Sequence, residues 1–240
     1  MRYNSKILAV TAVLAVGMMM TACGGKTASS AAASSAASSV PASSTAASSE
    51  AAQTGDILPI AQGTLEDMKT DNYKLAANIT AIKDGQMTMT VYCYDAYEKA
   101  DIDGLQTGTV LDVHDQGSST AATKMTVESI ERDEENGYVT INGGVEQGGV
   151  ELCLDHDVYR TVTFDDYPVY YEMGELTLPM AEDVSISDTS ADPQADAVIT
   201  EGATAVEDAF NADPDNWNCG NTTVFTENGK VSGVLRIWVP

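Results

Sequence analysis

Apolar and polar residues alternate along two parts of the chain, and each part contains a two-residue turn signal. In residues 86–94 (QMTMTVYCY) apolar side chains alternate with threonine and tyrosine, which is the pattern of a half-buried strand. This run follows residues 74–83 after Asp84-Gly85, and Asp-Gly between alternating runs favours a tight hairpin. A second pair of such runs flanks Asn228-Gly229. The sequence therefore predicts two β-hairpins, one in each half of the folded part.

Between these hairpins the chain has more short apolar runs, separated by turn-rich segments. They are residues 105–113, 124–132, 138–142, 149–154, 159–164, 169–171, 175–178 and 183–187. Turn signals about every 8–12 residues are typical of an all-β barrel or sandwich. We expect an all-β fold, an antiparallel barrel or sandwich of about ten short strands. An open barrel of the oligonucleotide/oligosaccharide-binding type is one arrangement that fits, by analogy alone.

One segment has helical spacing instead. In residues 201–212 (EGATAVEDAFNA), Val206 and Phe210 fall on one side, with acidic residues facing away. Pro214 stops the pattern, because proline cannot continue a helix. The sequence thus predicts one short helix.

The beginning of the chain has a three-part pattern of its own. Arg2 and Lys6 supply positive charge, and residues 7–22 (ILAVTAVLAVGMMMTA) form an uncharged, mostly apolar stretch that ends before Cys23. A membrane-spanning helix needs about 20 apolar residues, so this shorter stretch is typical of a secretory signal peptide. Two interpretations give Cys23 no special role. In one the stretch is an ordinary signal peptide, and in the other it is an anchor that is not cleaved.

The segment Met20-Thr21-Ala22-Cys23, followed by Gly24-Gly25, resembles the lipobox of bacterial lipoproteins. Met20 departs from the pattern, because the family usually has leucine or another aliphatic residue there. The resemblance implies that residues 1–22 are removed and that Cys23 becomes the first residue, acylated with chains such as palmitate. Two such chains suffice for stable anchoring, whereas one alone binds a membrane marginally.

Residues 24–55 are dominated by alanine and serine, and Val40 is their only large aliphatic side chain. Such a segment buries too little apolar surface to offset the entropy of ordering, so we expect a disordered tether. A flexible coil of this length spans roughly 30 Å. Glycosylation of its serines is an alternative role. The expected organisation is a signal peptide (1–22), the lipidated cysteine with its tether (23–55), and an all-β domain (56–240).

The charge balance narrows the possible partners. The 240 residues include 12 Lys and Arg against 36 Asp and Glu, which gives a formal net charge of -24. Nucleic acid needs Lys and Arg to neutralise its phosphates, and anionic lipid headgroups need the same charges. We therefore expect no nucleic-acid partner, and we expect membrane attachment through the lipid anchor alone.

No catalytic motif stands out in the sequence. It contains no GxSxG elbow, SxxK pair, GxxxxGK[ST] phosphate loop or GxGxxG fingerprint. His114 and His156 each lie beside aspartates, and we interpret both as exposed loop histidines rather than zinc ligands. We expect no catalytic residue, cofactor or metal site. A calcium-stabilised structural module, with oxygen ligands near 101–103 or 211–215, is an alternative that the acidic composition leaves open.

Three cysteines remain after Cys23. Cys93 shares the apolar face of its strand and is expected to be a small buried hydrophobe. A disulfide between Cys153 and Cys219 is an alternative to free thiols.

Tyrosines and carboxylates gather in the segment 155–171. The residues that could form a ligand-binding surface are Tyr159, Tyr167, Tyr170, Tyr171, Asp165 and Asp166. A glycosidase would need two carboxyl groups about 5–9 Å apart across a groove, so a surface hydrolase acting on glycans or peptides is the rival hypothesis.

These observations favour a lipid-anchored protein of the cell envelope that faces the extracellular side or the periplasm. The strand pattern is similar to that of barrel domains in uncharacterised surface lipoproteins, a likeness that implies no activity. We expect a non-catalytic binding role, with an envelope glycan or protein as the partner.

Overall fold

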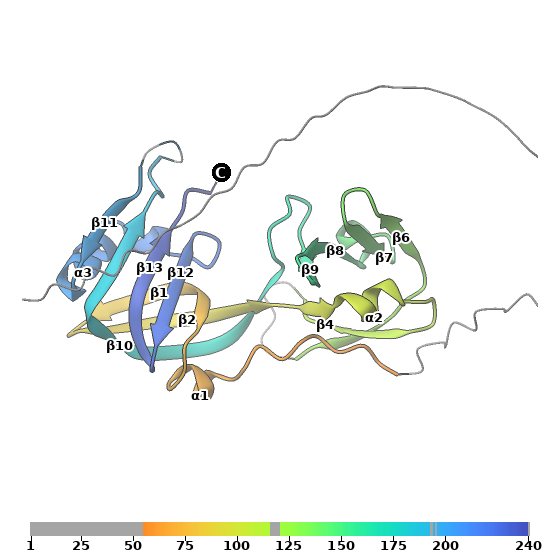
Figure 1. Ribbon diagram of the computed structural model, residues 1–240, viewed down its shortest axis with the longest axis horizontal. Helices are drawn as coiled ribbons and strands as arrows, with labels where there is room; N and C mark the ends of the chain where they lie inside the picture. The colour runs from red at the N-terminus through yellow and green to blue at the C-terminus, as the bar shows by residue number, and fades with distance from the viewer. Residues whose placement is uncertain (1–54, 116–120, 193, 195, 240) are drawn as a thin grey trace, which may run out of the picture. The chain divides into compact units, whose positions relative to one another are not determined.

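The hairpin predicted at Asp84-Gly85 joins β1 (Lys74–Lys83) to β2 (Gln86–Tyr94), as Figure 1 shows. The one predicted at Asn228-Gly229 joins β12 (Thr222–Glu227) to β13 (Lys230–Arg236). All four turn residues have φ between 50° and 74°, as a two-residue turn of type I′ requires. The computed structural model describes residues 55–115, 121–192, 194 and 196–239. The expected signal peptide, Cys23 and the tether through residue 54 lie outside them.

The strand β10 (Tyr170–Asp188) closes these two hairpins into a barrel. Its first half, Tyr170–Pro179, pairs antiparallel with β2, and its second half pairs parallel with β13. Since β1 also pairs with β12, the five strands form a ring in the order β1-β2-β10-β13-β12. Figure 1 shows how β10 curves to reach both neighbours. A closed ring of five strands is a barrel, one of the two arrangements that the strand pattern predicts.

The barrel encloses the larger hydrophobic core. Its strands turn alternate residues inward, and Met87, Met89 and Val91 of β2 have no exposed surface. The short edge strand β11 (Val198–Glu201) extends the sheet beside β10, and α3 (Ala203–Ala212) follows it. Val206 and Phe210 of α3 complete this core, on the side of the helix that the spacing predicted.

A second group of strands is inserted between β2 and β10. A five-stranded sheet has the order β3-β9-β8-β7-β6, and β4 pairs with β5 in a separate hairpin. The bounds are β3 (Ala96–Glu98), β4 (Val110–Val113), β5 (Thr123–Thr126), β6 (Ile130–Asp133), β7 (Tyr138–Ile141), β8 (Val150–Asp155) and β9 (Val158–Val162). These elements surround a second core, which includes the buried side chains of Tyr97, Leu111 and Leu152.

The remaining elements are short. They are the helices α1 (Leu65–Met68) and α2 (Lys99–Asp103) and the 3₁₀ turns Val145–Gln147 and Pro214–Asn216. Thr64 caps α1 by a reciprocal exchange with Asp67, in which each side chain accepts a hydrogen bond from the other residue's backbone nitrogen. None of the helices in the described part of the chain has the length and apolar character needed to span a bilayer.

The all-β prediction is confirmed, with differences in detail. The described residues contain 13 strands, of which β10 is 19 residues long. It absorbs three runs that the sequence separates, because the irregularities at Glu172–Gly174 and Met180–Ser185 bend the strand without ending it. The barrel is not purely antiparallel, since β10 and β13 run parallel.

Candidate functional site

The outside of the barrel carries a pocket of about 320 Å³ between two tyrosine rings and two cationic side chains. We call it the tyrosine pocket, and its lining residues are Lys74, Ala76, Tyr94, Asp155, Arg160, Pro168, Tyr170 and Thr223. The volume is at the lower end of the range for ligand sites. The pocket is therefore large enough for a small ligand or for one end of a longer one.

The alternation of the strands explains why these side chains meet. In β1, Leu75 and Ala77 point into the core, so Lys74 and Ala76 point outward. Tyr94 of β2 and Tyr170 of β10 are directly paired in the antiparallel register. Their ring centroids lie 6.1 Å apart at an interplanar angle of 70°, which is an edge-to-face contact.

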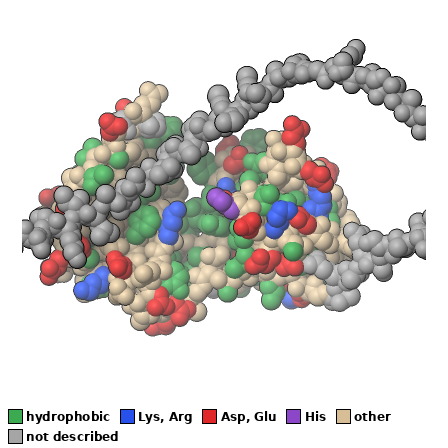
Figure 2. Space-filling view, viewed as in Figure 1, with side chains coloured by type: hydrophobic (Ala, Val, Ile, Leu, Met, Phe, Trp, Pro, Cys, Tyr) green, Lys and Arg blue, Asp and Glu red, His purple; other side chains and the backbone are tan. Residues whose placement is uncertain are grey.

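Positive charge gathers at the tyrosine pocket in a strongly acidic protein. Arg160 is held by Asp155, with 3.5 Å between Nε and Oδ2, and it donates from Nη1 to the backbone oxygen of Asp166 at 3.2 Å. Lys74 makes no ion pair with any residue that the structure describes. Figure 2 shows acidic side chains spread over the visible surface, with Lys and Arg few among them. The free ammonium of Lys74 can thus attract an anionic group.

The protein shields Tyr170 from ionisation. Burial raises the pKa of its phenol to about 12, with the neighbouring Cys219 and Tyr94 adding to the effect. The hydroxyl therefore stays protonated at physiological pH and can donate a hydrogen bond.

A polar pair borders the pocket on the same outer face of the sheet. Asn78 donates from Nδ2 to the Tyr92 hydroxyl at 3.0 Å, and its Oδ1 accepts from the backbone nitrogen of Cys219 at 2.7 Å. These bonds fix the ring of Tyr92 beside the strand position of Tyr94.

The tyrosines and aspartates selected from the sequence are dispersed by the fold. Tyr170 lines the tyrosine pocket, while Tyr171, its neighbour in β10, points to the other face and is buried. Tyr159 is also buried, and Tyr167 is 39% exposed in the loop before β10. Asp165 is exposed, and Asp166 accepts a hydrogen bond from the Tyr138 hydroxyl at 2.8 Å. The structure does not bring these six side chains into one site.

Tyr171 belongs instead to a buried polar cluster. Its ring stacks on His114 with 3.7 Å between centroids and an interplanar angle of 13°. His114 Nδ1 lies 2.8 Å from Oδ1 of Asp95, which is 1% exposed. The interpretation of His114 as an exposed loop residue is wrong, because Asp95, at the end of β2, supplies a buried partner. His156 is exposed as expected, with 93% of its side chain accessible.

The thiols are free in the described part of the chain. Cys93, Cys153 and Cys219 are all unpaired, so the Cys153–Cys219 disulfide considered from the sequence is not formed. Each is partly buried rather than exposed. Burial raises the pKa of Cys93 to about 11, and Asp95 adds to the effect, so its thiol is a poor nucleophile near neutral pH.

Tyr159 lines a different cavity of about 410 Å³ in the inserted sheet. The two cations there are already engaged by the protein. Lys99 pairs with Asp103, and Arg132 donates to the backbone oxygen of Ile102 at 2.8 Å. This cavity thus has less capacity than the tyrosine pocket to attract an anionic ligand.

The chemistry of the tyrosine pocket favours binding over hydrolysis. Asp155 is the one carboxylate among its lining residues, and Arg160 neutralises it. A glycosidase needs two carboxyl groups facing each other. Among the described residues, no three His, Cys, Asp or Glu side chains are placed to hold a metal ion. The segments 101–103 and 211–215 therefore hold no such group either.

Sequence reasoning missed most of this pocket. Lys74 and Tyr94 lie at the open end of the predicted hairpin of β1 and β2. Arg160 and Tyr170 lie on strands that are distant from this hairpin in sequence, and nothing local indicates that they meet it. The one usable signal is the polar face of residues 86–94, which ends in two tyrosines, Tyr92 and Tyr94. Comparison of the chain with protein-family models, with curated proteins and with solved structures finds no match.

Proposed function

We propose that this chain is a lipid-anchored protein of the bacterial cell envelope whose barrel binds an anionic saccharide, without catalysis, in the tyrosine pocket. The observation that carries the proposal is the meeting of Tyr94, Tyr170 and the unpaired Lys74 around one pocket. Aromatic walls supply apolar contact area, and a few placed polar groups orient the ligand. The ammonium of Lys74 pairs with a carboxylate or sulfate of the sugar.

The sequence supports the location in the envelope. The lipobox-like segment that ends at Cys23 provides the anchor, and the Ala/Ser-rich segment 24–55 provides the spacer. The net charge of -24 disfavours electrostatic docking onto an anionic membrane, so attachment depends on the lipid. In cells that express the chain, Cys23→Ala is expected to move it from the membrane fraction to the soluble fraction. Full retention of this variant on membranes would contradict the anchor.

The test of the binding site uses two ligands that differ by one charge, methyl glucuronide and methyl glucoside, with full-length protein in detergent and titration calorimetry. We expect the glucuronide to bind more tightly. Lys74→Met should weaken its binding by about 1.5- to 5-fold, since Lys74 is exposed and an exposed ion pair contributes about 0.2–1 kcal/mol. The glucoside should bind both proteins alike.

Two further variants test the aromatic wall. Tyr94→Ala should weaken both sugars, whereas Tyr167→Ala, a control outside the pocket, should weaken neither. Equal affinity for both sugars, or equal loss in both tyrosine variants, would contradict this site. Circular dichroism of each variant shows whether the barrel remains folded.

A further inference from the structure

A larger concave surface lies on another part of the barrel, between α3, β11 and the end of β10. We call it the α3–β11 groove, and its volume is about 640 Å³. Its lining residues are Ile186, Asp188, Thr189, Ser190, Ala191, Asp192, Asp196, Val198, Thr200, Ala205, Asp208, Ala209, Ala212, Asp213 and Arg236. Apolar side chains from the helix and both strands form much of its wall.

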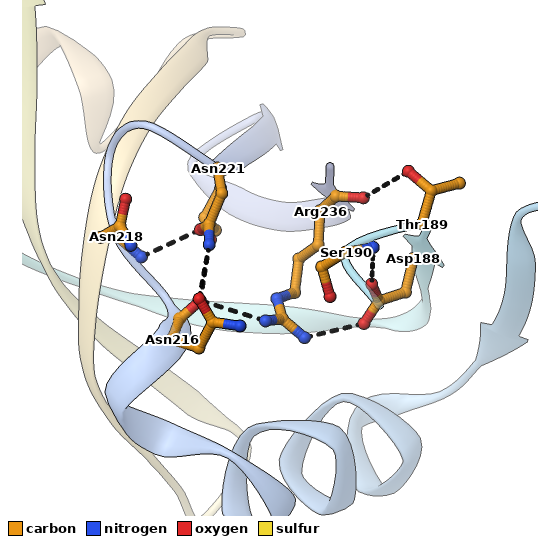
Figure 3. Close-up of polar contacts among 8 residues, drawn as sticks. Asp188, Thr189, Ser190, Asn216, Asn218, Asn221 and Arg236 are labelled. Atoms are coloured by element: carbon orange, nitrogen blue, oxygen red, sulfur yellow. Dashed lines mark hydrogen bonds and ion pairs between the residues drawn. The ribbon is translucent and has the colours of Figure 1, made fainter. Parts of the chain in front are cut away.

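Arg236 is the one cation among the described residues that line the groove, and it is already used inside the protein, as Figure 3 shows. Arg236 Nη1 lies 2.8 Å from Oδ2 of Asp188, and Nη2 donates to the backbone oxygen of Asn216 at 3.0 Å. The guanidinium carbon lies 4.6 Å from the ring centroid of Trp217. Only 5% of the Arg236 side chain is exposed. Arg236 therefore compensates Asp188 and leaves the other carboxylates of the groove unbalanced.

Four exposed aspartates surround the apolar part of the groove. They are Asp192, Asp196, Asp208 and Asp213. None of them forms an ion pair with a Lys or Arg of the described residues. A ligand that fills the groove and carries positive charge would match both the apolar wall and this acidic rim.

The strand beside the groove has a free edge. Among the described strands, β11 pairs with β10 alone, so its opposite edge presents unpaired backbone groups. Val198 and Ile199 are 64% and 67% exposed, which is unusual for aliphatic side chains in a sheet. Val198 and Thr200 line the groove, and a strand added to this edge would direct every second side chain toward the same side.

We propose that β11 and the α3–β11 groove bind an extended basic peptide by strand addition. The backbone of the peptide pairs with the free edge of β11. Its apolar side chains enter the groove, and its Lys or Arg side chains face the four aspartates. A second copy of this chain fits poorly, because it would bring the same aspartates and another net charge of -24 against the first. This site is separate from the tyrosine pocket, with which it shares no lining residue.

The test measures binding of a blocked hexapeptide of alternating Lys and Val to the full-length protein by fluorescence anisotropy at low ionic strength. Two matched probes accompany it. The same peptide N-methylated at every residue keeps its charge but has no backbone donors, and a Glu-Val hexapeptide has the opposite charge. We expect binding of the Lys-Val peptide alone, with new protection of β11 amides in hydrogen exchange. Equal binding of either matched probe, or no binding of the Lys-Val peptide, would overturn the proposal.

Variants locate the charge effect on the rim. Asp192→Asn and Asp208→Asn should each raise the Kd by about 1.5- to 5-fold, the effect of one exposed ion pair. Glu207→Gln and Glu227→Gln remove the same charge from side chains that do not line the groove, and they should change the Kd less. Equal effects in both pairs would mean that only the net charge matters and would refute the rim. Concentration-dependent dimerisation that protects the same β11 amides and excludes the peptide would identify a second copy as the occupant instead.

Discussion

Asp95 binds His114 through both carboxylate oxygens, with Oδ1 at 2.8 Å from the ring Nδ1 and Oδ2 at 2.7 Å from the backbone nitrogen. The two residues lie at the ends of different strands, β2 and β4, so this contact fixes the end of one strand against the end of another. Because Asp95 is 1% exposed, water cannot replace either bond without opening the structure.

Substitution of this carboxylate should lower stability. In Asp95→Asn, the amide nitrogen cannot accept a hydrogen bond, so one of the two bonds is lost or reversed in a buried place. We expect the free energy of unfolding to fall by about 1–3 kcal/mol in urea denaturation. Asp115→Asn is the matched control, since Asp115 is exposed beside His114 and its substitution should change stability by less than about 0.5 kcal/mol. Equal stability of the two variants would show that the contact of Asp95 with His114 does not stabilise the fold.

Alkaline pH should destabilise the fold through Tyr170. Its pKa is raised by burial to about 12 in the folded protein, whereas an unfolded tyrosine titrates near 10. The folded state therefore binds more protons between these values, and stability falls as pH rises through that window. The contribution is complete below about pH 10. In denaturant titrations across this range, Tyr170→Phe should show a shallower decline than the unsubstituted protein, and an identical decline would contradict the assignment.

The thiol of Cys93 should react slowly in the folded protein. Burial raises its pKa to about 11, and its Sγ contacts the sulfur of Met173 at 3.0 Å. Alkylation by iodoacetamide near neutral pH should leave Cys93 largely unmodified in the native state and modify it fully in urea, as peptide mass mapping would show. Equal labelling in both states would indicate that the thiol is accessible.

The two hairpin turns separate the cost of backbone strain from the cost of a steric clash at an added Cβ. Gly85 and Gly229 have φ of 74° and 71°, so alanine at either position costs about 1–2 kcal/mol in backbone strain. A Cβ at Gly85 would meet nothing within 4 Å, whereas one at Gly229 would lie 1.9 Å from the Lys69 backbone oxygen. Gly229→Ala should therefore cost about 1–3 kcal/mol more than Gly85→Ala in thermal or urea unfolding. Equal costs would show that the loop at Lys69 adjusts freely.

The hairpins and α3 could be predicted because their signals are local. Asp84-Gly85 and Asn228-Gly229 determine their turns by backbone preference, and Val206 and Phe210 share one side of a helix by spacing alone. The bend in β10 could not be predicted, since it depends on β2 and β13 both offering edges to one strand. The pairing of Tyr94 with Tyr170 also depends on which strands are neighbours in the sheet. The sequence alone indicates only tyrosines that are close together along the chain. His114 was misinterpreted because Asp112 and Asp115 are its neighbours in sequence, while its buried partner is Asp95.

The position of β13 between β12 and β10 determines when the barrel can close during folding. Until Lys230–Arg236 takes its place, one side of the sheet has no strand to join its two flanks, and the aliphatic lining stays open to water. Such closure brings together segments far apart in sequence, which is slow compared with helix formation. A chain truncated before this strand would consequently remain a substrate for chaperones and proteases.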